Sequence, residues 1–215
     1  IVDSLVGSEM CIRDSIIGGK ILGQENKSIL GTGDYLIVEA DESDASFLHL
    51  NPEISVVTNI DNDHLDYYEN NLEKLDSTFL QFLENLPFFG SAIICTDSER
   101  SKKVFENLSR PKISYGFDKK ADYFIKDLKQ QAKFQKFKII RNSTGKEISL
   151  ELTLPGKHNA LNATAAFIVA QNICIDNLVI PFLNNGDFII ELPRYLSFII
   201  TQIWIVGLIT VSYTH

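Results

Sequence analysis

Residues 35–60 read YLIVEADESDASFLHLNPEISVVTNI, two mainly apolar runs separated by a polar segment. The runs, 35–40 and 54–60, each end in polar or acidic side chains. Short apolar runs of this kind are typical of strands that are buried on both faces of a parallel sheet. Longer amphipathic stretches alternate with such runs along the chain. The pattern therefore predicts an α/β fold, a mostly parallel sheet flanked by helices.

The rest of the chain extends this pattern. Apolar residues recur at helical spacing over 72–86, and SAIICT at 91–96 predicts a third buried strand. Polar and apolar residues alternate over 122–154, which predicts a small antiparallel hairpin with its turn at 142–145. The alanine-rich segment HNALNATAAFIVAQNI at 158–173 predicts a helix.

Composition excludes several classes of protein. The chain has 215 residues, 45% of them hydrophobic and 22% charged, which are the proportions of a globular domain rather than of a disordered chain. Its formal net charge of -8 is a poor match for duplex nucleic acid. The three cysteines, Cys11, Cys95 and Cys174, are far apart and form no CxxC motif, so neither a disulfide framework nor a structural zinc site is predicted. We expect a cytoplasmic protein.

The first segment with candidate functional side chains is EADESDASF at 39–47, at the end of a predicted strand. It holds four carboxylates, Glu39, Asp41, Glu42 and Asp44, which repel one another unless a cation relieves them. Ligands of open α/β sheets bind beyond the carboxyl ends of strands, so a hard metal ion is one interpretation. A solvated acidic loop is the other, and these residues alone leave both open.

The second segment is TNIDNDHLDYY at 58–68, again past a strand end. Its acidic spacing suggests an EF-hand, but the glycine that such a loop requires is missing. His64 lies between Asp63 and Asp66, and a carboxylate can orient one ring nitrogen while the other faces a metal. A purely structural histidine remains the alternative.

The third segment is LPGKHNALNATAA at 154–166, at the predicted start of the alanine-rich helix. Asn159 and Asn162 share one helix face, and an asparagine amide can pair with the N6 and N7 edge of adenine. The unpaired N–H groups of a first helical turn also favour anions. Helix capping by Asn159 is the structural alternative.

Together these segments resemble the Mur ligases, over about residues 16–180. The resemblance implies the central ATPase domain of a three-domain enzyme, with a sheet like that of P-loop NTPases. The run ESDASFL at 42–48 is most similar to the members of the family that join L-alanine to UDP-N-acetylmuramate. Those two substrates, ATP and Mg²⁺ are therefore the implied partners and cofactors, in peptidoglycan precursor synthesis. Nucleic acid and membrane are not implied.

The resemblance also implies residue roles. Glu39 and His64 would be catalytic as magnesium ligands, placed at the ends of neighbouring parallel strands. His158, Asn159 and Asn162 would bind ATP at its adenine. The chain contains no G-x-x-x-x-G-K-[ST] loop, so we expect it to be inactive as an isolated fragment.

The two ends of the chain differ from its middle. Residues 1–15 and the apolar tail at 181–215 match nothing in the family, and we expect both to be non-native. Three alternative functions stay open. They are a sibling ligase that attaches a recycled peptide to the same sugar nucleotide, a non-catalytic nucleotide-binding module, and a membrane protein that spans the bilayer at 195–213, a run without charged residues.

Overall fold

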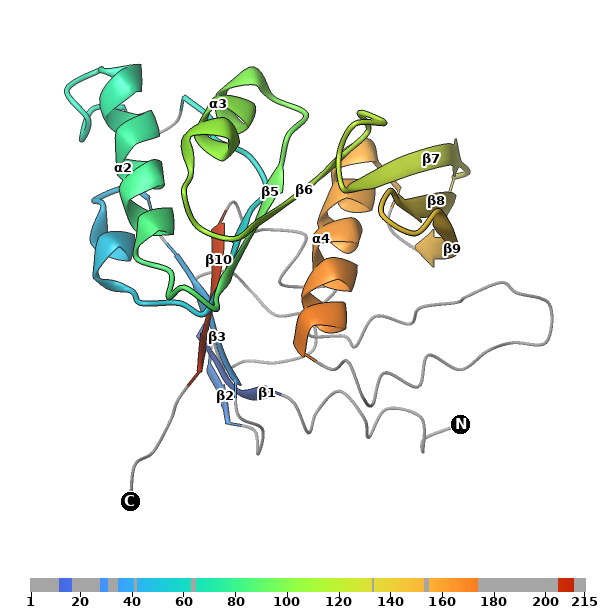
Figure 1. Ribbon diagram of the computed structural model, residues 1–215, viewed down its shortest axis with the longest axis horizontal. Helices are drawn as coiled ribbons and strands as arrows, with labels where there is room; N and C mark the ends of the chain where they lie inside the picture. Colours follow the sequence, from blue (N-terminus) through green and yellow to red (C-terminus); the bar gives the residue numbers. More distant parts are fainter. Residues whose placement is uncertain are drawn as a thin grey trace.

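The computed structural model describes residues 12–16, 28–30, 35–40, 42–62, 65–132, 134–152, 155–173 and 205–210. The strands within these ranges are β1 (Ile12–Ile16), β2 (Ser28–Leu30), β3 (Tyr35–Glu39), β4 (Ile54–Val57), β5 (Ser91–Cys95), β6 (Lys112–Gly116), β7 (Tyr123–Gln130), β8 (Gln135–Arg141), β9 (Lys146–Leu152) and β10 (Ile205–Thr210). In this part of the chain they form one ten-stranded sheet in the order β2-β1-β3-β10-β4-β5-β6-β7-β8-β9 (Figure 1).

The centre of the sheet is parallel, as the sequence predicted. Strands β4, β5, β6 and β7 pair in parallel, and β1 pairs in parallel with β3. The helices α2 (Leu72–Glu84) and α3 (Glu99–Asn107) connect β4 to β5 and β5 to β6. The predicted strands at 35–40, 54–60 and 91–96 and the predicted helix at 72–86 are all confirmed.

The sheet is covered on both faces (Figure 1). Ile93 and Cys95 of β5 join one buried cluster with the helix α4 (Lys157–Ile173). Ala92 and Ile94 join a second cluster with α2 and with the short 3₁₀-helix η2 (Ser46–His49). Successive side chains of a strand point to opposite faces, so the uninterrupted apolar run of β5 is explained by burial on both sides.

The ends of α2 follow from local sequence. The Asn71 side chain accepts hydrogen bonds from the N–H groups of Glu73 and Lys74, which satisfies two donors of the first turn. Leu75, Phe79, Phe82 and Leu83 form the buried stripe of the helix. The helix ends at Glu84, shortly before Pro87, as the periodicity predicted.

The predicted hairpin is confirmed and extended by one strand. Strands β8 and β9 pair antiparallel around the turn at 142–145, where Gly145 has φ of 66°. Strand β7 also pairs antiparallel with β8, so the unit is a three-stranded meander attached to the parallel sheet. Its alternating burial leaves one face in solvent, which explains the alternating sequence.

Strand β10 changes the expected neighbourhood of the site. It lies antiparallel between β3 and β4, with Val206 opposite both Glu39 and Val56. The prediction that Glu39 and His64 follow neighbouring strands is therefore wrong, because an apolar segment of the tail occupies the position between them. The ends of β3 and β4 share one edge of the sheet, separated by two strand spacings, about 10 Å.

Two further predictions concern the ends of the chain. Ile12–Ile16 and Ile205–Thr210 are strands that the sequence did not predict. The domain boundaries at 15/16 and 180/181 stay predictions. Most of the apolar run 195–213 lies outside the described residues, and within the described ones no helix is both long and apolar enough to cross a membrane.

Candidate functional site

The acidic segment after β3 folds back against the core. Glu39 and Ala40 end the strand, and Phe47 of η2 is buried between the rings of Phe79 and Phe82, with centroid distances of 5.5 and 5.0 Å. The exposed Asp44 accepts a hydrogen bond from the Ser46 N–H at 2.9 Å. Hydrogen bonds from the Ser46 side chain and backbone lower the pKa of Asp44. Asp44 thus serves the local turn, whereas Asp41 lies outside the described residues.

The segment after β4 begins with a short series of local hydrogen bonds. The Asn59 side chain accepts from the Ile60 N–H at 2.9 Å, and Ile60 is buried. The Asp61 carboxylate accepts from the Asn62 N–H at 3.0 Å and is exposed. Asp63 and His64 lie outside the described residues. The predicted metal ligation by His64 therefore stays a prediction.

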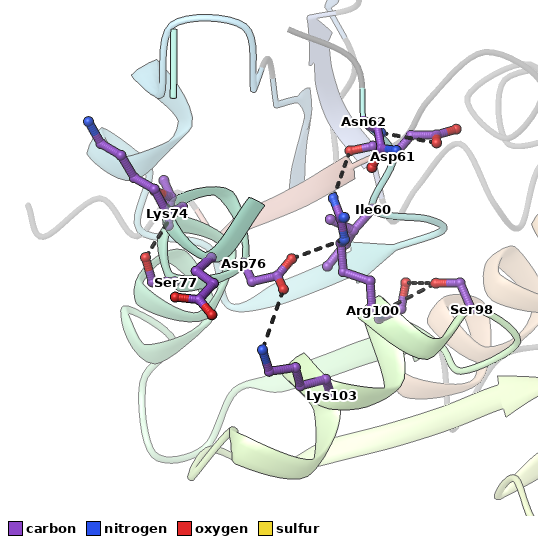
Figure 2. A network of polar contacts seen from close by, with 12 residues as sticks. Ile60, Asp61, Asn62, Lys74, Asp76, Ser77, Ser98, Arg100 and Lys103 are labelled. Atoms are coloured by element: carbon purple, nitrogen blue, oxygen red, sulfur yellow. Dashed lines mark hydrogen bonds and ion pairs between the residues drawn. The ribbon is translucent and has the colours of Figure 1, made fainter. Parts of the chain in front are cut away.

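Arg100 connects the start of this segment to an ion pair between α2 and α3 (Figure 2). Arg100, in the first turn of α3, places its Nε 3.2 Å from Asp76 of α2 and donates from Nη1 to the Asp61 carbonyl at 3.4 Å. Lys103 lies 3.9 Å from the same Asp76 carboxylate. Burial raises the pKa of Asp76, although Arg100 and Lys103 oppose this. The sequence did not predict a role for Arg100. The only indication in the sequence is that Arg100 is a cation shortly after the end of the strand β5.

The third segment starts α4. Gly156 has φ of 121°, a left-handed conformation that a side chain would strain, and α4 begins at the next residue. Asn159 is buried and its Nδ2 donates to the Pro155 carbonyl at 2.7 Å. Asn159 is the third residue of α4 and donates to a carbonyl that precedes the helix, so this bond is not the helix cap that was its structural alternative. Asn162 is partly buried on the same helix, and His158 is exposed.

Side chains from three elements gather near the start of α4. The Lys157 ammonium lies over the ring of Phe117, 4.5 Å from its centroid. Asp97, which follows β5, accepts from the Phe117 N–H at 2.7 Å, and Phe117 follows β6. Burial raises the pKa of the Cys95 thiol to about 11, so the thiol is protonated near neutral pH.

The described residues bring the three predicted segments to the carboxyl edge of one sheet. Glu39 ends β3, and the segment with Asp61 follows β4. The first turn of α4, which contains Asn159, lies near the ends of β5 and β6 through the contacts of Lys157, Phe117 and Asp97. Within the described ranges no group of three His, Cys, Asp or Glu side chains is placed to hold a metal. Since His64, Asp63 and Asp41 are outside those ranges, this observation does not test the predicted site.

Comparisons with known proteins agree with this architecture. The family model for the Mur ligase middle domain matches residues 25–170. The UDP-N-acetylmuramate--L-alanine ligases of Legionella pneumophila strains Corby and Lens are 40% identical over 177 residues, 82% of this chain and 38% of their own length. The chain thus spans less than half the length of these relatives.

Solved structures share the fold. The UDP-N-acetylmuramate-alanine ligase of Thermotoga maritima has a TM-score of 0.65 at 24% identity, covering 80% of this chain and 38% of its own. The UDP-N-acetylmuramate:L-alanyl-gamma-D-glutamyl-meso-diaminopimelate ligase of Neisseria meningitides has a TM-score of 0.64 at 19% identity, covering 80% and 56%. At these identities the likeness concerns the fold alone.

Proposed function

This chain belongs to the Mur ligase family through its middle domain, and we propose that it is the central ATP-binding part of a ligase that joins L-alanine to UDP-N-acetylmuramate. The observation that carries the proposal is 40% identity over 82% of the chain to ligases of that name. Residues 16–180 would form this domain. The setting would be peptidoglycan precursor synthesis in the cytoplasm.

The proposed reaction has two steps. A carboxylate oxygen of UDP-N-acetylmuramate attacks the γ-phosphorus of ATP, ADP leaves, and an acyl phosphate forms. The amine of L-alanine then attacks the acyl carbon, inorganic phosphate leaves, and the amine loses a proton as the amide forms. Little covalent chemistry falls to the protein, so its work is to position the phosphates and stabilise their charge.

Glu39 and His64 are the proposed magnesium ligands. A carboxylate that closes an apolar strand at the carboxyl edge of the sheet fits a hard cation, which prefers oxygen donors. Magnesium, when bound, would screen the phosphate oxygens. Glu39 ends β3 and the segment containing His64 follows β4, and these two strands end at the same edge of the sheet with β10 between them.

Asn159, Asn162 and His158 are the proposed adenine-binding residues. The bond from Asn159 Nδ2 to the Pro155 carbonyl fixes the plane of the amide. An amide NH₂ has two hydrogens, so one donor remains for N7 of adenine while Oδ1 accepts from N6. The helix-end bond of Asn159 is therefore compatible with adenine binding.

The test uses the complete enzyme that contains this chain. We expect ADP formation that depends on UDP-N-acetylmuramate, L-alanine and Mg²⁺. Glu39→Gln should lower turnover by about a hundredfold, a typical loss when one charge-stabilising group leaves an active site. The matched control is Glu106→Gln on the exposed face of α3, which should leave turnover unchanged. A Glu39→Gln enzyme with normal turnover and Mg²⁺ dependence would contradict the assignment.

A double substitution tests whether the two ligands share one ion. His64→Ala should also depress turnover, and the double mutant should be little worse than the worse single mutant, since both residues would act through the same ion. Fully additive losses would argue against a shared site. The 215-residue chain itself should form no ADP, because its sequence lacks the phosphate-binding motif.

A sibling ligase remains the second candidate. It would attach a recycled peptide to the same sugar nucleotide. The name of the Neisseria enzyme contains such a peptide, L-alanyl-gamma-D-glutamyl-meso-diaminopimelate, and its fold matches this chain almost as well as that of the Thermotoga enzyme. Supplying the complete enzyme with L-alanine or with L-alanyl-gamma-D-glutamyl-meso-diaminopimelate separates the two. We expect turnover with L-alanine, and a preference for the peptide would favour the sibling.

A further inference from the structure

A buried glutamine side chain connects the antiparallel meander to the turn that starts α4. Gln135 is the first residue of β8 and is 0% exposed. Its Nε2 donates to the Gly156 carbonyl at 3.0 Å, across 21 residues of sequence. Because Gln135 pairs with β7 on one side and with β9 on the other, its backbone is fixed within the sheet. The bond therefore ties the turn at Gly156 to a rigid element.

The body of α4 is held independently of this bond. Phe167 of α4 is buried in the same core cluster as Phe137 of the meander. The Gly156 carbonyl also accepts from the Ala160 N–H at 3.3 Å, and a carbonyl oxygen has two lone pairs, so it can accept both bonds. Removal of the Gln135 donor would therefore leave the helix packed and the Gly156 carbonyl hydrogen-bonded.

The turn at Gly156 lies directly against two of the proposed adenine-binding residues. A Cβ added to Gly156 would lie 2.9 Å from His158 Cε1 and 3.4 Å from Asn159 Nδ2. The Asn159 Nδ2 donates to the Pro155 carbonyl, which comes directly before that of Gly156 in the chain. Two successive carbonyls thus accept from Gln135 and from Asn159. A shift of this short segment would therefore move the Asn159 amide.

We propose that Gln135 is a positioning residue for the adenine site, acting through the Gly156 carbonyl to hold the Asn159 amide in place for the base. This inference rests on the proposed function, and Gln135 touches no nucleotide in this role. Without the bond, the first turn of α4 would take up more positions, and the nucleotide would have to order it on binding. Because that ordering costs binding free energy, the affinity for adenine nucleotides should fall.

The experiment measures the binding of ADP to the complete enzyme by isothermal titration calorimetry, so no turnover is needed. Gln135→Met replaces the amide by an apolar side chain of similar length and removes the donor. The matched control is Gln130→Met, because Gln130 is exposed and lies opposite Gln135 in the pairing of β7 with β8. Gln135→Met should raise the dissociation constant of ADP about threefold to tenfold, the effect of one hydrogen bond. Gln130→Met should leave that constant unchanged.

Two further readouts separate positioning of the adenine site from a general loosening of the enzyme. In Gln135→Met, the dissociation constant of UDP-N-acetylmuramate, which has no adenine, and the thermal unfolding midpoint without nucleotide should stay near those of the unsubstituted enzyme.

An unchanged affinity for ADP in Gln135→Met would overturn the positioning role while leaving the ligase assignment intact. Equal losses of affinity for ADP and UDP-N-acetylmuramate, or a variant that no longer folds, would also overturn it, because the bond would then serve the fold as a whole. If the unsubstituted enzyme did not bind ADP, the proposed function itself would fail, and the role of Gln135 with it.

Discussion

Asp76 and Arg100 form an ion pair between α2 and α3, with Nε 3.2 Å from Oδ1 and side chains only 15% and 17% exposed. The same guanidinium reaches the Asp61 carbonyl (Figure 2). The packing of the two helices is thereby coupled to the first residues of the segment after β4. Burial raises the pKa of Asp76 despite the nearby cations, which shows that desolvation outweighs their attraction.

We predict that removing either Asp76 or Arg100 alone lowers the free energy of unfolding. Asp76→Ala should destabilise the chain by about 1–3 kcal/mol, because it leaves a largely buried guanidinium without its carboxylate. The Asp76→Ala/Arg100→Ala double mutant should lose less than the sum of the single losses, as measured by urea unfolding. The exposed pair Glu69–Lys74, at 2.8 Å, is the control and should show no measurable coupling. Additive losses at Asp76 and Arg100 would contradict the prediction.

Glu84 should make stability depend on pH. Burial raises the pKa of Glu84, but hydrogen bonds from the Ser109 hydroxyl and N–H, together with Arg110, outweigh this and lower it below 4.5. A depressed pKa in the folded state means stabilisation that is present above the unfolded pKa and lost as pH falls through the folded pKa. Glu84→Gln should therefore cost on the order of 1 kcal/mol at about pH 7 and almost nothing at about pH 3.

The control for this prediction is Ser109→Ala. It removes one donor to the carboxylate, so NMR titration of the Glu84 carboxyl carbon should show a higher pKa than in the unsubstituted chain. A Glu84→Gln penalty that is equal at both pH values would show that the carboxylate charge is not the cause.

The sequence predicted the helix whose buried apolar residues recur periodically, α2, and did not predict the helix that lacks such a period, α3. The stripe that includes Leu75 and Phe79 gives α2 its clear helical period. Helix α3 reads ERSKKVFEN, and its buried residues are Ser101 and Val104, so its apolar signal is too weak for prediction. Its only sequence mark was Ser98, whose side chain accepts from the Ser101 N–H.

The candidate site shows the same limit. Residue types at strand ends predicted which segments would lie at one edge of the sheet, because parallel strands bring their carboxyl ends to the same edge. Contacts such as Tyr68 with Glu42 and Arg100 with Asp61 join residues 26 and 39 positions apart. Such contacts depend on tertiary packing and on which strand lies between β3 and β4, and neither leaves a local pattern.

Phe47 should be the most sensitive residue of the acidic segment. It is 1% exposed and packs against Phe79 and Phe82, so Phe47→Ala should cost about 3–5 kcal/mol through lost burial and a cavity. Phe88→Ala is the control, because that ring is 82% exposed and its loss should barely change stability. The measurement is chemical unfolding of the chain, and similar losses for the two variants would contradict the burial of Phe47.

The final prediction concerns Gly116 and Asp97, beside the start of α4. A Cβ on Gly116 would lie 2.3 Å from Asp97 Oδ1, the oxygen that accepts from the Phe117 N–H. Gly116→Ala must therefore displace the carboxylate and break that bond, at a cost of about 1–3 kcal/mol. Asp97→Ala removes both the bond and the obstacle, so adding Gly116→Ala to it should cost much less than in the native background.

Gly145 provides the control for this coupling. Its left-handed φ of 66° strains any side chain, but no atom lies within 4 Å of an added Cβ. Gly145→Ala should destabilise the chain by about 1 kcal/mol with or without Asp97, because its cost is conformational rather than steric. Urea unfolding of the single and double mutants measures both couplings. Equal costs of Gly116→Ala in the two backgrounds would mean that the carboxylate is not what the new methyl group meets, and that Gly116 is needed for another reason.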